Sequence, residues 1–161
     1  MKYSISITIV SILLSNLLIA GCSGKLRPDG MPRLVPCSIL VKQDATPLAN
    51  ANVSIIPENG SKWNAAGVTD NSGVAKLYTL SQYEGVPEGK YKVVISKTET
   101  VLGIIGASDR SSEGTPDQHF NLVEPQYSNP TDTPLTIEVT KKNSHYEVNA
   151  GKKVKIQEEQ R

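Results

Sequence analysis

Two cysteines and two histidines are the side chains of this 161-residue sequence best suited to nucleophilic or metal chemistry. The thiol of Cys22 follows two small residues, which leave a nucleophile accessible to modifying enzymes. Cys37 differs, because it alternates with apolar residues at positions 35, 39 and 41 and is therefore predicted to be a small core residue of a strand. If Cys22 is modified, Cys37 remains the only free thiol, and no intramolecular disulfide can form.

The first 21 residues are typical of a secretory signal peptide. Lys2 gives them a basic start, and residues 5–20 form an apolar run that ends in small residues. Ser and Asn residues interrupt this run, which favours a signal peptide over a membrane-spanning helix. The run ends in a motif that resembles a bacterial lipobox, made of Ile19, Ala20, Gly21 and Cys22. The resemblance implies that Cys22 becomes the first mature residue and carries the acyl chains of a lipid anchor.

The net charge of the mature chain indicates which kinds of partner it can bind. Cleavage before Cys22 removes Lys2 from the 17 basic residues and leaves 16, against 16 acidic ones. A neutral chain without a basic stripe argues against a nucleic-acid partner. Ser23 follows the cysteine, and by resemblance to bacterial lipoproteins it favours the outer membrane if the host is Gram-negative. The predicted location is therefore the cell envelope, with the membrane contacted through the N-terminal lipid.

The rest of the chain alternates apolar and polar residues in short segments separated by turn residues. These segments cover residues 35–42, 52–57, 66–69, 74–80, 90–97, 135–140, 146–148 and 154–156. The residues from Asp70 to Gly73 are typical of a hairpin turn, with glycine where a positive φ is needed. No window of eleven or more residues has a helical period. The pattern predicts an all-β fold, an Ig-like β-sandwich of seven to nine short strands.

The predicted organisation has four parts: a cleaved signal peptide at 1–21, a lipidated N-terminus and tether at 22–33, a sandwich at 34–158 and a frayed tail at 159–161. The stretch from Glu99 to Asp132 interrupts the alternation, because it is rich in Gly, Ser, Pro, Asp and Asn. Its apolar islands at 101–105 and 120–123 are expected to fold back over a sheet edge or the end of the core. A functional loop is the alternative.

Four segments in order resemble the carboxypeptidase regulatory-like, or transthyretin-like (prealbumin-like), β-sandwich domain, especially that of small bacterial lipoproteins. They are ATPLANANVSI at 45–55, GVTDNSG at 67–73, GKYKVVI at 89–95 and PQYSNPTDTPLTIEV at 125–139. Ala75 departs from the pattern, since an aromatic residue is usual there. The resemblance implies a single seven-stranded transthyretin-like sandwich and a non-catalytic accessory or binding role. Its expected partner is an envelope protein, contacted through sheet edges or the stretch from Glu99 to Asp132.

Two groups of residues in the sequence have side chains that could bind a metal ion. The turn at Asp70 resembles the start of a Ca²⁺ loop, but the glutamate that ends an EF-hand loop is absent. His119 and His145 could join Tyr127 and Tyr146 in an iron site, as in the intradiol ring-cleaving dioxygenases, which share a transthyretin-like fold. The two histidines are 26 positions apart, however, and lack the close pairing of that family. A metal-dependent oxygenase is therefore only a remote alternative, and no metal or cofactor is predicted.

Enzymatic motifs are also missing from the sequence. It contains neither the Gly-x-Ser-x-Gly elbow of hydrolases nor a glycine-rich phosphate loop, so no catalytic residues are predicted. The only tryptophan, Trp63, could stack on a sugar beside Asn64, which makes a glycan-binding module the main alternative function. A tryptophan near a turn can equally cap the core and leave its indole N–H at the surface.

Overall fold

The computed structural model describes residues 27–103 and 116–158. The chain divides into two compact units, Met1–Met31 and Pro32–Arg161, and all the described strands belong to the second. The predicted signal peptide, the lipobox from Ile19 to Cys22 and the tail at 159–161 lie outside the described residues. Within the described ranges, no helix is long and apolar enough to cross a membrane.

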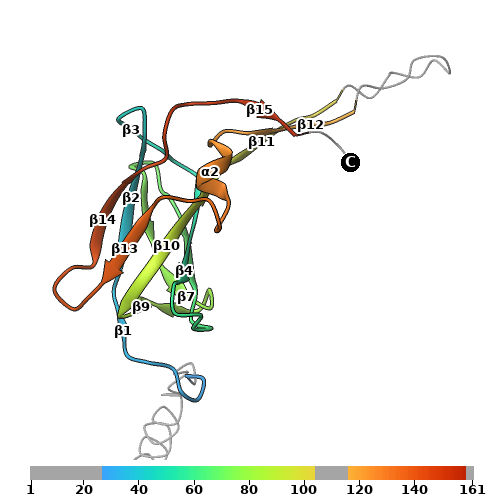
Figure 1. Cartoon of the computed structure of the whole chain (residues 1–161). Coiled ribbons are helices and arrows are strands. Elements are labelled where there is room, and N and C mark those ends of the chain that lie inside the picture. Colours follow the sequence, from blue (N-terminus) through green and yellow to red (C-terminus); the bar gives the residue numbers. More distant parts are fainter. Residues whose placement is uncertain (1–26, 104–115, 159–161) are drawn as a thin grey trace, which may run out of the picture. The chain divides into compact units, whose positions relative to one another are not determined.

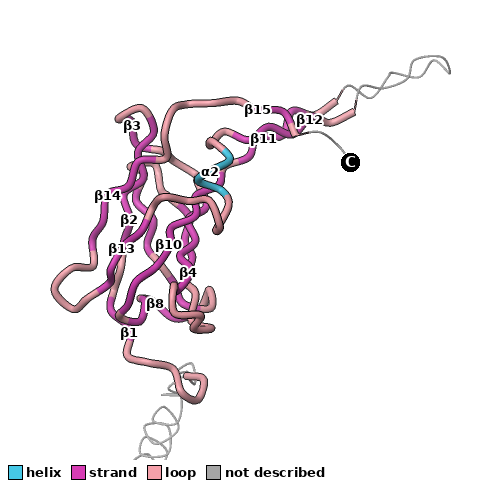
Figure 2. Tube along the Cα trace, in the orientation of Figure 1, coloured by secondary structure: helices cyan, strands magenta, loops and turns pink. Residues whose placement is uncertain are grey.

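The larger sheet has six strands, and neighbouring strands are antiparallel. Their order is β13 (Thr136–Val139), β10 (Gly89–Ser96), β4 (Asn52–Pro57), β5 (Ala65–Val68), β7 (Tyr78–Thr79) and β8 (Tyr83–Glu84). At its centre β4 and β10 pair over six residues. The sequence alternation dictates two faces, because Val53 and Ile55 point into the core while Asn52 and Ser54 point outward. Figure 2 shows that strands dominate this unit.

The second sheet is built around β2 (Ser38–Gln43). Its partners are β14 (His145–Asn149), β3 (Thr46–Pro47) and β6 (Val74–Lys76). β3 and β6 run antiparallel to β2, whereas β14 runs parallel to it from the pair Ser38 and His145 to the pair Lys42 and Asn149. A separate pair joins β1 (Leu34–Val35) to β9 (Val86–Pro87).

The hydrophobic core lies between these two sheets. Its largest fully buried side chains come from facing strands and include Ile39, Val41, Val53, Ile55, Val93, Ile95 and Val139. Burying an aliphatic side chain of this size contributes about 1.5–3 kcal/mol relative to leaving it exposed. The predicted β-sandwich is therefore confirmed for the described residues (Figure 1).

The stretch from Glu99 to Asp132 differs from the expected irregular loop. Its described residues form two strands, β11 (Thr98–Val101) and β12 (Gln118–Asn121), which pair with each other. The third strand is β15 (Ile156–Gln157), so the predicted closing strand at 154–156 belongs here and not to the sandwich. We call β11, β12 and β15 the arm. Figure 1 shows that the arm continues β10 beyond the sandwich.

After β12 the chain returns to the core, as expected for a stretch that folds back over the sandwich. Val123 is buried in the core cluster, and the single helical turn α2 (Pro125–Ser128) brings Tyr127 against it. Gln43 holds the base of the arm, because its buried Nε2 donates to the carbonyl of Leu122 at 2.9 Å and to that of Lys152 at 3.0 Å. Of the second apolar island, Val123 is in the core, whereas Phe120 lies on β12 in the arm. Val101 and Leu102 of the first island are exposed and do not fold back over the core. Ile104 and Ile105 of the first lie outside the described residues.

Candidate binding surfaces

Trp63 lies between β4 and β5, and its side chain is buried. Only 7% of the residue is exposed, and the ammonium of Lys62 lies 4.8 Å from the ring centroid. The neighbouring Asn64 is exposed, and its carbonyl accepts a hydrogen bond from the backbone of Leu80. A sugar needs an open ring face to stack on, and this position does not offer one. The burial of Trp63 weighs against the glycan platform at Trp63 and Asn64.

The residues considered for an iron site lie in different parts of the fold. His119 is on β12, where its Nδ1 lies 3.0 Å from Thr100 Oγ1. His145 is on β14, where its Nδ1 lies 2.7 Å from Ser38 Oγ. Tyr146 follows it, and its hydroxyl is engaged with backbone carbonyls. Among the described residues, no group of three or more His, Cys, Asp and Glu side chains could hold a metal ion.

The turn after β5 is held by Asp70 as the sequence predicted. One carboxylate oxygen, Oδ1, accepts hydrogen bonds from the backbone and hydroxyl of Ser72 and from the backbone of Val74. The hydroxyl of Ser72 is the main cause that lowers the pKa of Asp70, and the backbone of Val74 adds to it. Gly73 has a φ of 80°, a conformation that glycine adopts without strain. These bonds give Asp70 the role of a structural turn residue.

Cys37 is buried in the core cluster, as predicted. Desolvation raises the pKa of its thiol to about 11. Because the thiolate is the reactive form, this raised pKa lowers the reactivity of the Cys37 thiol in the folded protein.

We expect Cys37 in a Cys22→Ser full-length variant to react with a disulfide reagent at pH 8 about a hundredfold more slowly than in the unfolded chain. The measurement compares the labelling rate of the folded protein with that of the protein unfolded in about 8 M urea, both at pH 8. A folded protein that reacts at the unfolded rate would show that the thiol is accessible. A Cys37→Ala variant gives the background rate.

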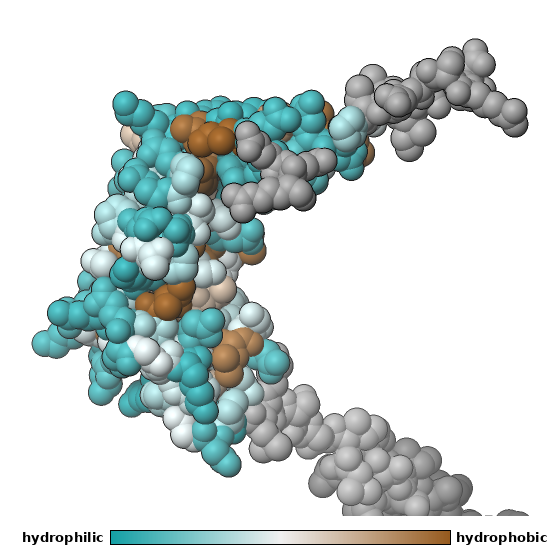
Figure 3. Space-filling view, turned by 45° about the vertical axis from the view of Figure 1, so that its right-hand side comes forward, coloured by the Kyte–Doolittle hydropathy of each residue, from teal (hydrophilic) through white to brown (hydrophobic). Residues whose placement is uncertain are grey.

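The arm carries exposed apolar side chains outside the core. Leu102 is 77% exposed, and Val101 and Ile156 are also exposed. Backbone pairing joins the three strands, and Lys155 adds side-chain contacts between them, because it bridges Glu99 at 3.0 Å and lies 4.5 Å from the Phe120 ring centroid. The arm residues are at most partly buried, so no described residues cover either face of this sheet with an apolar layer. Figure 3 shows apolar patches that are separated by hydrophilic surface.

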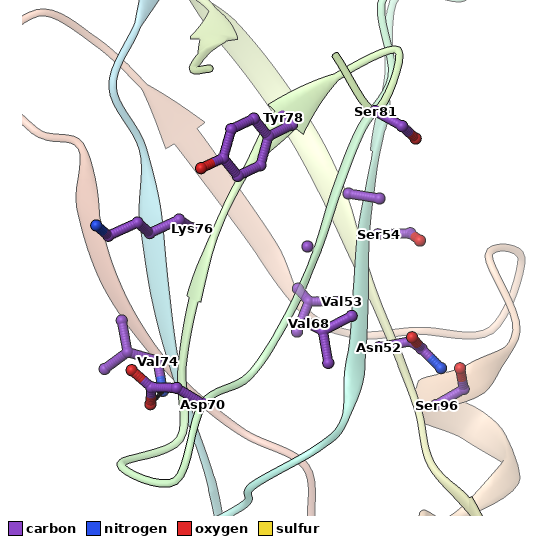
Figure 4. Close-up of a pocket in the computed structure, with 12 residues that line it drawn as sticks. Asn52, Val53, Ser54, Val68, Asp70, Val74, Lys76, Tyr78, Ser81 and Ser96 are labelled. Atoms are coloured by element: carbon purple, nitrogen blue, oxygen red, sulfur yellow. Dashed lines mark hydrogen bonds between the residues drawn. The ribbon is translucent and has the colours of Figure 1, made fainter. Parts of the chain in front are cut away.

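A second surface lies on the outward face of the larger sheet. It is a hollow of about 680 Å³, which we call the outer-face hollow. Its floor consists of small side chains on neighbouring strands, because Ser54 pairs with Ala66 on β5 and Ser96 pairs with Asn52. Tyr78 and Lys76 form one side, and Ser54, Asn52 and Ser96 lie on the other (Figure 4). At the centre Val68 is 59% exposed.

Sequence reasoning missed this hollow. The signal that could have found it is the size of the outward residues: Asn52, Ser54 and Ala66 are small, where an outward sheet face commonly carries long polar side chains. The cross-strand register places them side by side, and that register is not readable from single strands.

Comparisons with known proteins do not assign the chain to a family. No protein-family model matches the chain, and no curated protein matches its sequence. Among solved structures the chain is similar to BcpA, the major pilin subunit of Bacillus cereus, with 15% sequence identity and a TM-score of 0.44. The similarity covers 77% of this chain and 31% of the pilin chain, so this chain spans less than a third of that protein.

Proposed function

We propose that the protein is a lipid-anchored, non-catalytic module of the bacterial cell envelope that binds another protein through its arm. The observation that carries this proposal is the arm itself, whose apolar side chains at Val101, Leu102 and Ile156 are exposed without contributing to the core. Exposed apolar side chains gathered on one small sheet are a candidate contact site for another macromolecule. A contact through the arm leaves the sandwich undisturbed.

The proposal includes a transthyretin-like framework of seven strands. Two sheets with the orders β6-β2-β14 and β5-β4-β10-β13 supply seven strands, and the remaining short strands are additions to them. The first sheet contains the parallel pair β2 and β14, which a simple hairpin meander does not produce. This mixed order supports the resemblance drawn from the four sequence segments.

A non-catalytic role is supported by the state of the reactive groups. Cys37 is buried, and its thiol is protonated at neutral pH. Ser38 and His145 form the one described pair of a hydroxyl and an imidazole on the sandwich, but no described carboxylate is hydrogen-bonded to His145 to orient it. A nucleophilic serine requires such a framed base. The pair is therefore assigned to strand pairing between β2 and β14.

The anchor is proposed from the lipobox and is tested by intact mass. We expect protein extracted from host membranes to have the mass of residues 22–161 plus acyl groups, and the Cys22→Ser variant to lack both the cleavage and the added mass. A cleaved but unacylated product from the wild-type gene would contradict the anchor and leave a secreted module.

The arm contact is tested by photocrosslinking in intact cells. A photoreactive amino acid at Leu102 is expected to give one discrete adduct with an envelope protein, and replacing Val101 and Ile156 by serine in the same chain is expected to abolish it. The matched control places the same group at Leu80, which is exposed on the sandwich. Equal adducts from both positions, or none from Leu102, would contradict a partner at the arm.

A further inference from the structure

We propose that the outer-face hollow is a binding site for a neutral oligosaccharide. This inference stands apart from the protein partner of the arm, because the residues that line the hollow belong to the sandwich and none belongs to β11, β12 or β15. It also differs from stacking at Trp63, which is buried.

The size and shape of the hollow suit a short sugar chain. Its volume of about 680 Å³ lies within the usual range of ligand sites in proteins. Cross-strand pairing builds its floor, since Ser54 lies beside Ala66 on one strand and beside Val94 on the other. The pair of Ala66 with Tyr78 then places the aromatic ring at the end of this row. A row of small side chains ended by a ring leaves a trough next to an aromatic wall.

The residues that line the hollow can contact both the apolar faces and the polar hydroxyls of a sugar. A pyranose ring has apolar C–H faces, which pack on aromatic and aliphatic groups, and a rim of hydroxyls, which exchange hydrogen bonds. Tyr78 is 36% exposed and offers a ring, and the aliphatic Val68 lines the same hollow two residues along β5 from Ala66, which pairs with Tyr78. Across the hollow, the side chains of Asn52, Ser54 and Ser96 make no hydrogen bond to another described residue. They are therefore free to donate to and accept from ligand hydroxyls.

The charges at the hollow favour a neutral ligand. Asp70 and Lys76 both line it, and their opposite charges leave no net charge there. An anionic ligand is attracted by clustered cations, which this lining lacks. The polar side chains of Asn52, Ser54 and Ser96 along one side favour a ligand rich in hydroxyls over a protein contact, which is centred on large apolar or aromatic side chains.

The test is a titration of the ¹⁵N-labelled full-length protein in dodecylphosphocholine micelles, a detergent without a sugar headgroup. The probes are cellohexaose, chitohexaose, laminarihexaose and maltohexaose at millimolar concentration. We expect at least one of them to shift the backbone amides of Ser54, Ala66 and Val68. The Tyr78→Ala variant is expected to weaken that binding about tenfold, through loss of the stacking surface.

Matched variants separate a lost site from a damaged fold. Tyr78→Phe keeps the ring and is expected to retain binding. Loss of binding in Tyr78→Ala supports the proposal only if the thermal unfolding midpoint of this variant lies within a few degrees of the wild type. If Tyr78→Ala is unstable, Asn52→Ala serves in its place. The proposal is overturned if no hexasaccharide shifts these amides, if Tyr78→Ala binds like the wild type, or if the shifts gather at Trp63 and vanish in Trp63→Ala. Because no step involves the arm, a failure here leaves the photocrosslinking result unaffected.

Discussion

Replacing Gly67 by alanine is expected to lower the free energy of unfolding by about 3 kcal/mol or more. A Cβ at this position would lie 2.2 Å from the carbonyl oxygen of Lys76 and 3.1 Å from its carbon. Both atoms belong to the backbone, so no side-chain rotation relieves the overlap. Gly67 pairs with Val53 on β4, so the strain acts on the centre of the sandwich. A domain has only about 5–15 kcal/mol of stability in total.

The measurement is urea unfolding followed by the fluorescence of Trp63, the only tryptophan. Gly60→Ala is the control, because Gly60 has a φ of 72° but nothing lies within 4 Å of its added Cβ. It is expected to cost only about 1 kcal/mol, from backbone conformation alone. If Gly67→Ala were no more destabilising than Gly60→Ala, the close approach of β5 to the strand at Lys76 would be wrong.

Replacing Thr69 by valine is expected to cost about 3 kcal/mol. Thr69 is 2% exposed, and its hydroxyl accepts from the backbone of Ala51 and donates to the carbonyl of Leu48, both at 2.7 Å. Valine has nearly the same shape but leaves these two buried groups without their partner. Each unsatisfied buried group costs about 1–3 kcal/mol.

Thr69→Ser is the matched variant, because it keeps the hydroxyl and removes only a methyl group. Thermal unfolding is expected to rank the three proteins with wild type first, Thr69→Ser second and Thr69→Val clearly last. A valine variant as stable as the serine variant would mean that the methyl group matters and the hydrogen bonds do not.

The sandwich was predictable because its strands obey a local rule. Val53 and Ile55 alternate with the polar Asn52 and Ser54, and a period of two places the two apolar residues on one face. Val93 and Ile95 share a face by the same period, although Val94 between them is apolar. The turn at Asp70 was predictable for a similar reason, since its hydrogen bonds reach no further than Val74. The burial of Cys37 followed from the same alternation in β2.

The arm and the outer-face hollow were not predictable, because both depend on residues far apart in the sequence. Glu99 has no apolar alternation around it, and its strand forms by pairing with Phe120 and through Lys155. The hollow depends on which residue of β5 lies opposite Ser54, and a shift of one residue would turn the other face outward. Acylation of Cys22 stays a prediction, since that residue lies outside the described part of the chain.

The parallel pairing of β2 with β14 has a mechanical consequence. β2 is the first long strand and β14 lies near the C-terminus, and they run in the same direction from Ser38 to Lys42 and from His145 to Asn149. A tension applied between the start of β2 and the end of β14 therefore acts along both strands. The backbone hydrogen bonds between them resist it together, in shear, and do not open one at a time. A protein held at its N-terminus and pulled at its C-terminal side would resist extension at this sheet.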